Sequence, residues 1–180
     1  HLDPVVAIRP DREYDPETPT QRDKDAIPHL IAPSKLWEGT KKILGSTVAL
    51  SYGPIQAVAA NRLSDANQFR AEGLTPIITP GHAPHHVSFQ TDNYLFAGEA
   101  CGVYLSLPQK KFYLRPGSPP RFFLNIALQS VDALIASQPK TICYSHFGIN
   151  EDALMMLEAN RDQLLLWEAL IKDEIQNSAA

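Results

Sequence analysis

The chain has 180 residues, of which 44 % are hydrophobic, and it carries a formal net charge of −4. This composition is ordinary for a globular protein with one full-sized core. The absence of a basic cluster argues against a nucleic-acid partner, and no apolar run reaches the ~20 residues of a membrane span. Cys101 and Cys143 are too few for a disulfide framework, so we expect two reduced, buried thiols and a soluble, cytoplasmic protein.

The sequence changes character near residue 28. Residues 1–28 are charged and rich in proline, and only the run 5–8 resembles a strand. A helix is predicted over 34–51, because apolar residues recur there at helical spacing after Ser34, a favourable N-cap. Gly45 is expected to stop or kink this helix.

Strand signals dominate the middle of the chain, where β-branched and aromatic residues are separated by turn residues. Pro76 lies inside one of these runs. Because proline cannot donate a ladder hydrogen bond, that strand is expected at a sheet edge or broken at this position. A hairpin turn is predicted at 91–93 and a loop over 110–120. The predicted strands are 56–60, 68–71, 74–79, 86–90 and 94–97.

Two helices and a strand are predicted in the last third of the chain. Apolar residues at helical spacing indicate a helix over 121–138, which Pro139 closes. A short strand follows at 141–144. A long helix is predicted over 151–176, and its apolar stripe is interpreted as a core-packing face.

Three short segments place metal-ligating side chains directly after strand-like runs, where a loop can direct them into a cleft. We interpret His82, Glu99 and His146 as one dispersed metal site. A histidine beside glycine is also common in turns and hydrogen-bonded cores, so spacing alone is insufficient. The segments are Thr79-Pro80-Gly81-His82-Ala83-Pro84-His85-His86, Leu95-Phe96-Ala97-Gly98-Glu99-Ala100 and Tyr144-Ser145-His146-Phe147-Gly148.

In this order the three segments resemble motifs of the metallo-β-lactamase-fold hydrolases, the superfamily that includes glyoxalase II. The first is similar to the family's central metal-binding turn, the second to its Phe-Thr-Gly-Asp segment, and the third to its last ligand motif. The resemblance extends over 29–167 and implies an α/β fold, the metallo-β-lactamase-type αββα sandwich. It makes 29–180 the C-terminal portion of such a domain, and 1–28 a divergent or mis-predicted segment.

The family's His-x-His-x-Asp-His motif, which supplies most of its metal ligands, is largely missing. Only His1-Leu2-Asp3 resembles a remnant, in which His1 and Asp3 match the second histidine and the aspartate, and Pro4 stands where a histidine is expected. We therefore expect an N-terminally truncated domain with its N-terminal β layer largely missing. The remaining sheet would then expose apolar surface, which leaves a homo-oligomer open.

The resemblance implies a metal-dependent hydrolase that uses a metal-bound hydroxide on a small ester, thioester or lactone-type substrate. His82, Glu99 and His146 would be metal ligands together with His1 and Asp3, and Asp3 would also act as the catalytic carboxylate. Zinc is expected as one or two ions, with iron or manganese as alternatives. Two other functions stay open: a degenerate metal-binding protein without turnover, and an iron-dependent oxidative enzyme on the same fold.

Glu99 departs from the family's usual aspartate. The extra methylene moves the carboxylate outward by about 1.5 Å, whereas metal–ligand distances tolerate about 0.2 Å. A carboxylate that bridges two metals would need a backbone adjustment, so binding of one metal or an altered choice of metal is an alternative.

Other polar and aromatic side chains near the motifs have two readings each. His85 or His86 orients a ligand through a hydrogen bond, or is a surface or strand histidine. Arg115 meets an anionic substrate, or is a solvated loop cation. Tyr104 and Tyr113 line the cleft, or pack in the core.

Overall fold

In a computed structural model of the protein, residues 20–22, 27–66, 68, 72–109, 111–119, 122–146 and 148–178 are described. The chain divides into two compact units, His1–Arg70 and Ala71–Ala180. His1, Asp3 and the strand-like run 5–8 lie outside the described residues, and the expected boundary at residue 28 stays a prediction. No helix in the described part of the chain combines the length and apolar character needed to cross a membrane.

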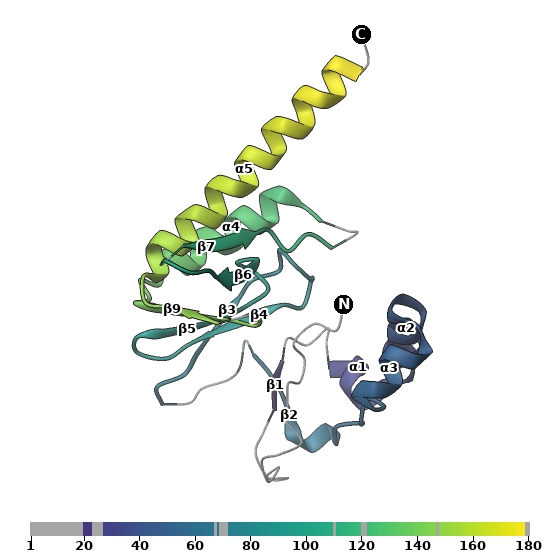
Figure 1. Cartoon of the computed structure of the whole chain (residues 1–180). Helices are drawn as coiled ribbons and strands as arrows, with labels where there is room; N and C mark the ends of the chain where they lie inside the picture. The colour runs from purple at the N-terminus through teal and green to yellow at the C-terminus, as the bar shows by residue number, and fades with distance from the viewer. Residues whose placement is uncertain are drawn as a thin grey trace. The chain divides into compact units, whose positions relative to one another are not determined.

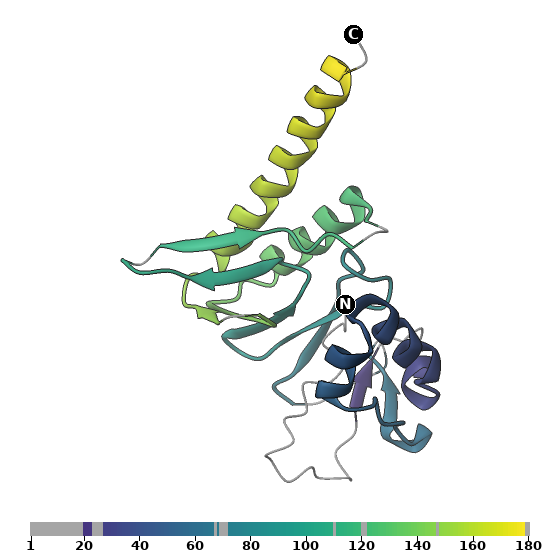
Figure 2. The ribbon, with the colours of Figure 1, turned by 45° about the vertical axis from the view of Figure 1, so that its right-hand side comes forward.

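The first unit combines a short pair of parallel strands with helices (Figure 2). The predicted helix over 34–51 is interrupted at Gly45, as its kink signal indicated, and becomes two helices. The strand predicted at 56–60 is wrong, because these residues form no strand and lead into a 3-10 helix. The strand predicted at 68–71 falls mostly outside the described residues. The elements are β1 (Thr20–Arg22), α1 (Ile27–Ile31), α2 (Ser34–Leu44), α3 (Ser46–Tyr52), η1 (Ala60–Arg62) and β2 (Leu63–Asp65).

The second unit is built on a five-stranded mixed sheet in the order β3-β4-β5-β8-β9. Pro76 lies on β3, which is an edge strand of this sheet, as predicted. β4 is antiparallel to both β3 and β5, and β5 is parallel to β8, so β3, β5 and β8 run in one direction. Their C-terminal ends therefore lie at the same edge of the sheet. The strands are β3 (Thr75–Ile78), β4 (Val87–Gln90), β5 (Tyr94–Gly98), β8 (Thr141–Tyr144) and β9 (Ile149–Asn150).

Helices α4 (Leu124–Ala136) and α5 (Ala153–Ser178) lie on the same side of this sheet (Figure 1). The core forms between them and one face of the sheet, where Leu95 of β5 and Ile142 of β8 pack in one cluster with Leu134 of α4 and Leu157 of α5. All four side chains are fully buried. Burial of this apolar surface is the main term that holds the sheet and helices together.

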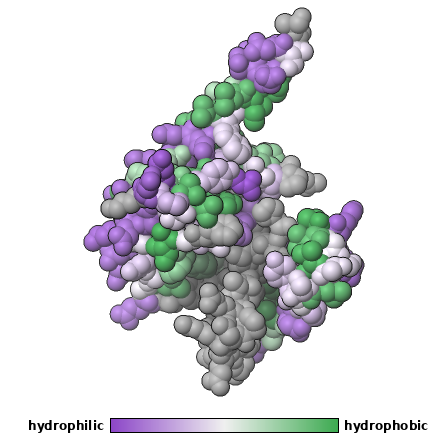
Figure 3. All heavy atoms as spheres, viewed as in Figure 1, coloured by the Kyte–Doolittle hydropathy of each residue, from purple (hydrophilic) through white to green (hydrophobic). Residues whose placement is uncertain are grey.

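The apolar stripe of α5 serves the core over only part of the helix. Leu164 is its last buried residue. Beyond it, Leu170, Ile171 and Ile175 are exposed, and Figure 3 shows apolar surface along this part of α5. The prediction that the whole stripe packs in the core is therefore wrong for the C-terminal half, because these side chains lie beyond the last residue of α5 that the core buries.

The loop predicted over 110–120 is in part a strand. β6 (Val103–Ser106) and β7 (Phe112–Arg115) form an antiparallel hairpin. The ring of Tyr104 on β6 stacks on Tyr144 of β8, with centroids 4.9 Å apart and planes 12° apart. Tyr104 and Leu114 of this hairpin are both buried in the core cluster that contains Tyr144.

The second face of the sheet carries a row of apolar side chains. Pro76, Phe89, Phe96, Cys143 and Ile149 are successive partners in the strand register, one on each of the five strands. None of them is buried, and Phe96 and Ile149 are 47 % and 60 % exposed. This is the kind of apolar sheet face that the sequence analysis expected. Pairing with a second copy stays a prediction.

Candidate metal centre

The three predicted ligands follow the C-terminal ends of strands that run in the same direction. His82 lies in the loop after β3, Glu99 follows β5, and His146 follows β8. The loops after β5 and β8 are joined directly, since the Ser145 N–H donates to the Gly98 carbonyl at 3.5 Å. The sheet topology thus brings together side chains that are far apart in the sequence.

One carboxylate lies between the two imidazoles. Nε2 of His82 is 2.6 Å from Oε2 of Glu99, and Nε2 of His146 is 2.6 Å from Oε1 of the same side chain. The side chains of His82 and Glu99 are 3 % and 1 % exposed, whereas that of His146 is 42 % exposed. The centre therefore has a buried half and a half that is open to solvent.

Gly81 allows the loop after β3 to approach α4 closely. A Cβ atom at this position would lie 2.6 Å from the Cα atom of Ala127 on α4. Since real Cβ atoms do not come this close to backbone, only glycine fits without a shift. The residue that precedes His82 is thus fixed against the helix.

A backbone carbonyl that the sequence analysis did not identify orients His82. Nδ1 of His82 is 3.0 Å from the carbonyl oxygen of Gly117, in the segment after β7. A carbonyl oxygen can only accept a hydrogen bond, so Nδ1 carries a proton and donates it. Sequence signals do not identify such a contact, because any residue type can supply a carbonyl.

This orientation determines what must lie between His82 and Glu99. With the Nδ1 proton directed at Gly117, the second ring nitrogen faces a carboxylate, which when ionised only accepts hydrogen bonds. As long as Glu99 is ionised, the close contact therefore requires a positive charge, either a second ring proton or a bound cation. Both imidazole nitrogens thus converge on one carboxylate.

The charge state of Glu99 follows from the same contacts. Burial raises the pKa of its carboxyl group, but the contacts and charges of His82 and His146 outweigh burial and hold this pKa below its ordinary range. Glu99 is therefore an anion at neutral pH, which is the form that binds metal.

The residue types of this centre fit a metal, but the imidazole nitrogens lie closer to the carboxylate oxygens than two ligands of one metal ion would. Two imidazoles and a carboxylate suit zinc and also iron. Ligands at zinc distances in a tetrahedron lie about 3.3 Å apart, whereas the nitrogen–oxygen distances here are 2.6 Å. In keeping with this, no group of three or more His, Cys, Asp or Glu in the described ranges is arranged to hold a metal ion. Side-chain rotations that open the contacts by about 0.7 Å would suffice on the same estimate.

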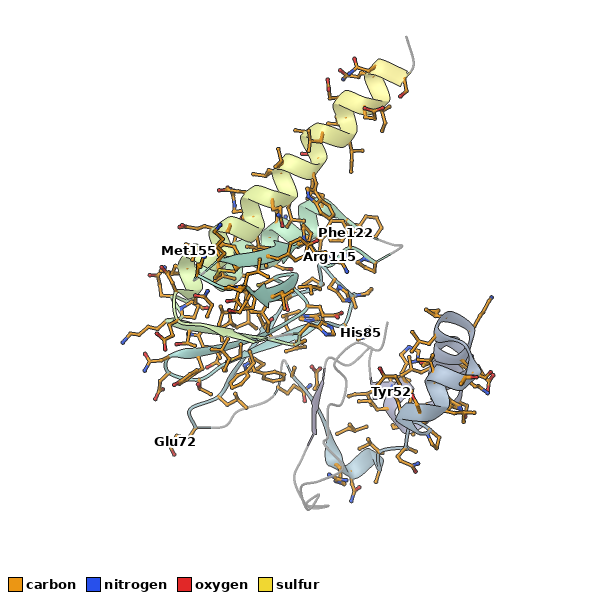
Figure 4. All side chains as sticks on the ribbon, in the orientation of Figure 1. Tyr52, Glu72, His85, Arg115, Phe122 and Met155 are labelled. Atoms are coloured by element: carbon orange, nitrogen blue, oxygen red, sulfur yellow. The ribbon has the colours of Figure 1, made fainter. Side chains whose placement is uncertain are left out.

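The remaining candidates take different places. His1 and Asp3 lie outside the described residues, so their roles stay predictions. Arg115 is exposed at the end of β7, and Figure 4 labels it together with His85. Tyr104 is buried in the core and Tyr113 is 51 % exposed, so core packing accounts for the first of these tyrosines.

The mixed sheet with helices on one face has the α/β architecture of the metallo-β-lactamase type. The crystal structure of an archaeal metallo-beta-lactamase superfamily protein from Sulfolobus tokodaii matches with a TM-score of 0.65 and 23 % sequence identity. The match covers 82 % of this chain and 58 % of that chain. The α/β fold class expected from the sequence is thereby confirmed.

A sequence comparison leads to the same class. The chain is 29 % identical over 151 residues to a metallo-beta-lactamase fold-containing protein of Sulfurisphaera tokodaii, a match that covers 79 % of this chain and 52 % of the relative. The chain thus spans about half the length of this curated relative. No family model matches the sequence. The resemblance to metallo-β-lactamase-fold proteins is confirmed.

Proposed function

We propose that this protein is a metal-dependent hydrolase of small ester, thioester or lactone-type substrates, with His82, Glu99 and His146 as metal ligands. One observation carries the proposal. Two imidazole nitrogens each lie 2.6 Å from an oxygen of one buried carboxylate, at the sheet edge where three strands end. The similarity to metallo-β-lactamase-fold proteins supports it.

The chain's own residues have separable roles in this proposal. The Gly117 carbonyl holds the His82 ring so that Nε2 faces the centre, and Glu99 supplies the negative charge that offsets a cation. His146 forms the solvent-exposed half, where a substrate approaches. When bound, the metal would supply Lewis acidity and activate water. Asp3 remains a proposed metal ligand and the proposed carboxylate that orients or deprotonates this water, and His1 remains a further proposed ligand.

Zinc is the proposed metal, as one or two ions, because it favours imidazole and carboxylate ligands. Iron and manganese are the alternatives, and iron would support oxidative chemistry on the same residues. A second candidate function is a metallo-β-lactamase-fold protein without turnover. One observation favours it, since both imidazoles contact the Glu99 carboxylate directly at 2.6 Å, a spacing shorter than that of ligands around a metal.

Metal content and hydrolysis, measured on the same preparations, test these functions. The full chain is expressed anaerobically and aerobically, and bound metals are quantified by mass spectrometry. Hydrolysis is followed with a chromogenic acetyl ester, an acyl thioester with a thiol reagent, and a γ-lactone with a pH indicator. The variants are Glu99→Gln and His146→Ala, and the matched control is His29→Ala, which removes an exposed histidine of the first unit.

The hydrolase proposal expects zinc and hydrolysis in the wild type and the control, and loss of both in the two site variants. Metal that persists in both site variants would reject the proposed ligands. Bound metal without hydrolysis of any substrate class would favour the protein without turnover. Iron retained only after anaerobic expression would favour the oxidative enzyme.

A further inference from the structure

His86 is a buried histidine outside the proposed ligand set that contacts both ligand-bearing loops. It is 5 % exposed and ends the loop that begins at Thr79. Its Nε2 atom accepts a hydrogen bond from the backbone N–H of Glu99 at 3.1 Å. Its Nδ1 atom lies 2.7 Å from the hydroxyl oxygen of Thr79. The ring thus joins the loop that carries His82 to the turn that carries Glu99.

The directions of these hydrogen bonds follow from the donors. Because a backbone amide can only donate, Nε2 of His86 carries no proton, and the ring proton lies on Nδ1 and is donated to Thr79. The Thr79 hydroxyl then donates to Ser88 Oγ at 3.1 Å, and Ser88 donates to the Ala97 carbonyl at 3.1 Å. We call this series from His86 to Ala97 the relay. All its members are buried.

Gly98 shows that the ring and the Glu99 turn fit closely. Its φ of +59° lies in the left-handed region, and a Cβ atom there would be 2.4 Å from Nε2 of His86. The imidazole therefore occupies the space that a side chain at position 98 would need. The residue directly before Glu99 is small because the histidine ring lies against it.

A fixed backbone is of particular use to a glutamate ligand. The glutamate side chain of Glu99 has one more rotatable bond than the aspartate that is usual in metallo-β-lactamase-fold hydrolases. Its carboxylate can therefore occupy more positions for a given backbone conformation. The His86 contact fixes the origin of that side chain. Hydrogen bonds behind a ligand commonly control metal affinity in this way.

We propose that His86 is a positioning residue, which holds the Glu99 backbone through Nε2 and couples it to the His82 loop through Nδ1 and Thr79. The proposal rests on the proposed function in taking Glu99 as a metal ligand. It goes beyond that function in assigning a role to a histidine that binds neither metal nor substrate.

The test separates the effect of losing the hydrogen-bond acceptor at Nε2 from the effect of losing the volume of the imidazole ring. His86→Leu removes the acceptor, whereas His86→Gln keeps an amide oxygen near that position. Ser88→Ala is the control, since it shortens the relay but leaves both ring contacts in place. The zinc affinity of each full-length variant is measured by competition with a chromophoric chelator, and its melting temperature is measured without metal.

We expect His86→Leu to weaken zinc binding by about 10- to 100-fold, and His86→Gln and Ser88→Ala to weaken it by less. The melting temperatures of the two His86 variants should fall by similar amounts. The difference between their zinc affinities then reports the positioning of Glu99 rather than the stability of the fold. Equal zinc affinities for His86→Leu and His86→Gln would overturn the proposal.

A second measurement needs no metal and no variant. Long-range ¹H–¹⁵N NMR spectra of the wild-type chain report which nitrogen of His86 carries the proton, and hydrogen exchange reports protection of the Glu99 amide. A proton on Nδ1 with a protected amide supports the proposal, and a proton on Nε2 overturns it. If the wild type binds zinc no better than Glu99→Gln, the proposed function fails, while this measurement still decides the His86–Glu99 contact.

Discussion

Replacing Glu99 by glutamine in the metal-free protein measures how the buried and open halves of the centre differ. The change keeps the size of the side chain but removes the charge that both imidazoles face. Both partners of the His82 contact are buried, and breaking one partner of such a pair costs about 3 to 5 kcal/mol. His146 is 42 % exposed, and a solvent-screened pair contributes about 1 kcal/mol or less. We expect the free energy of unfolding to fall by about 3 to 6 kcal/mol in total.

Urea denaturation followed by circular dichroism, with a chelator present, measures this loss at neutral pH. Double-mutant cycles with His82→Gln and His146→Gln then divide it, and we expect the Glu99–His82 coupling to be the larger. Glu168→Gln is the control, because Glu168 forms an exposed pair with Lys172 at 2.8 Å, and its loss should change stability by about 0.5 kcal/mol or less. A loss below about 1 kcal/mol for Glu99→Gln, or a larger coupling to His146, would refute the reasoning.

Three further predictions concern pH, backbone conformation and thiol reactivity. The imidazole contacts hold the pKa of Glu99 below its ordinary range, so the stability that they contribute is complete above the unfolded-state pKa and is lost as pH falls through the folded-state pKa. Acid denaturation of the metal-free protein should therefore steepen below about pH 4. Glutamine at position 99 should remove this part of the pH dependence. Gly98→Ala places a Cβ atom 2.4 Å from a buried imidazole nitrogen at a φ of +59° and should destabilise the protein by more than about 1 kcal/mol. Gly39→Ala is the control, because Gly39 has open space around it in α2, and alanine there should stabilise the protein by up to about 1 kcal/mol. Equal melting temperatures for these two variants would contradict the predicted contact at Gly98. Burial raises the pKa of both thiols, but Cys101 is fully buried whereas Cys143 is partly accessible. A disulfide reagent at mildly alkaline pH should therefore modify Cys143 first. Equal modification rates of the two thiols, measured by mass mapping, would be inconsistent with this packing.

The amino-acid sequence by itself determined the local elements whose signals are strong. The strands predicted at 74–79, 86–90, 94–97 and 141–144 correspond to β3, β4, β5 and β8, with ends that differ by no more than one residue. Their β-branched and aromatic runs favour the extended backbone regardless of what surrounds them. The prediction that the strand with Pro76 lies at an edge or is broken was equally local, since proline lacks the hydrogen-bond donor that an inner strand needs; the structure has it at the edge.

The residue types of the candidate centre could also be predicted. His82, Glu99 and His146 each follow a strand, and imidazole and carboxylate groups are the ligands that such a centre requires. What the sequence lacked was the distance between them. That depends on β3, β5 and β8 running in the same direction, which is a property of strand pairing rather than of any one segment.

Only the tertiary structure decided the features that depend on partners distant in the sequence. The β6–β7 hairpin packs on β8 through the stacking of Tyr104 on Tyr144. The exposed half of α5 extends past the last residue that the core buries. The Gly117 carbonyl and the His86 ring act on the centre through contacts across 35 and 13 residues. Local composition does not indicate such contacts. Every residue type has a backbone carbonyl, and a histidine has the same intrinsic propensities whether or not its ring accepts a hydrogen bond from an amide.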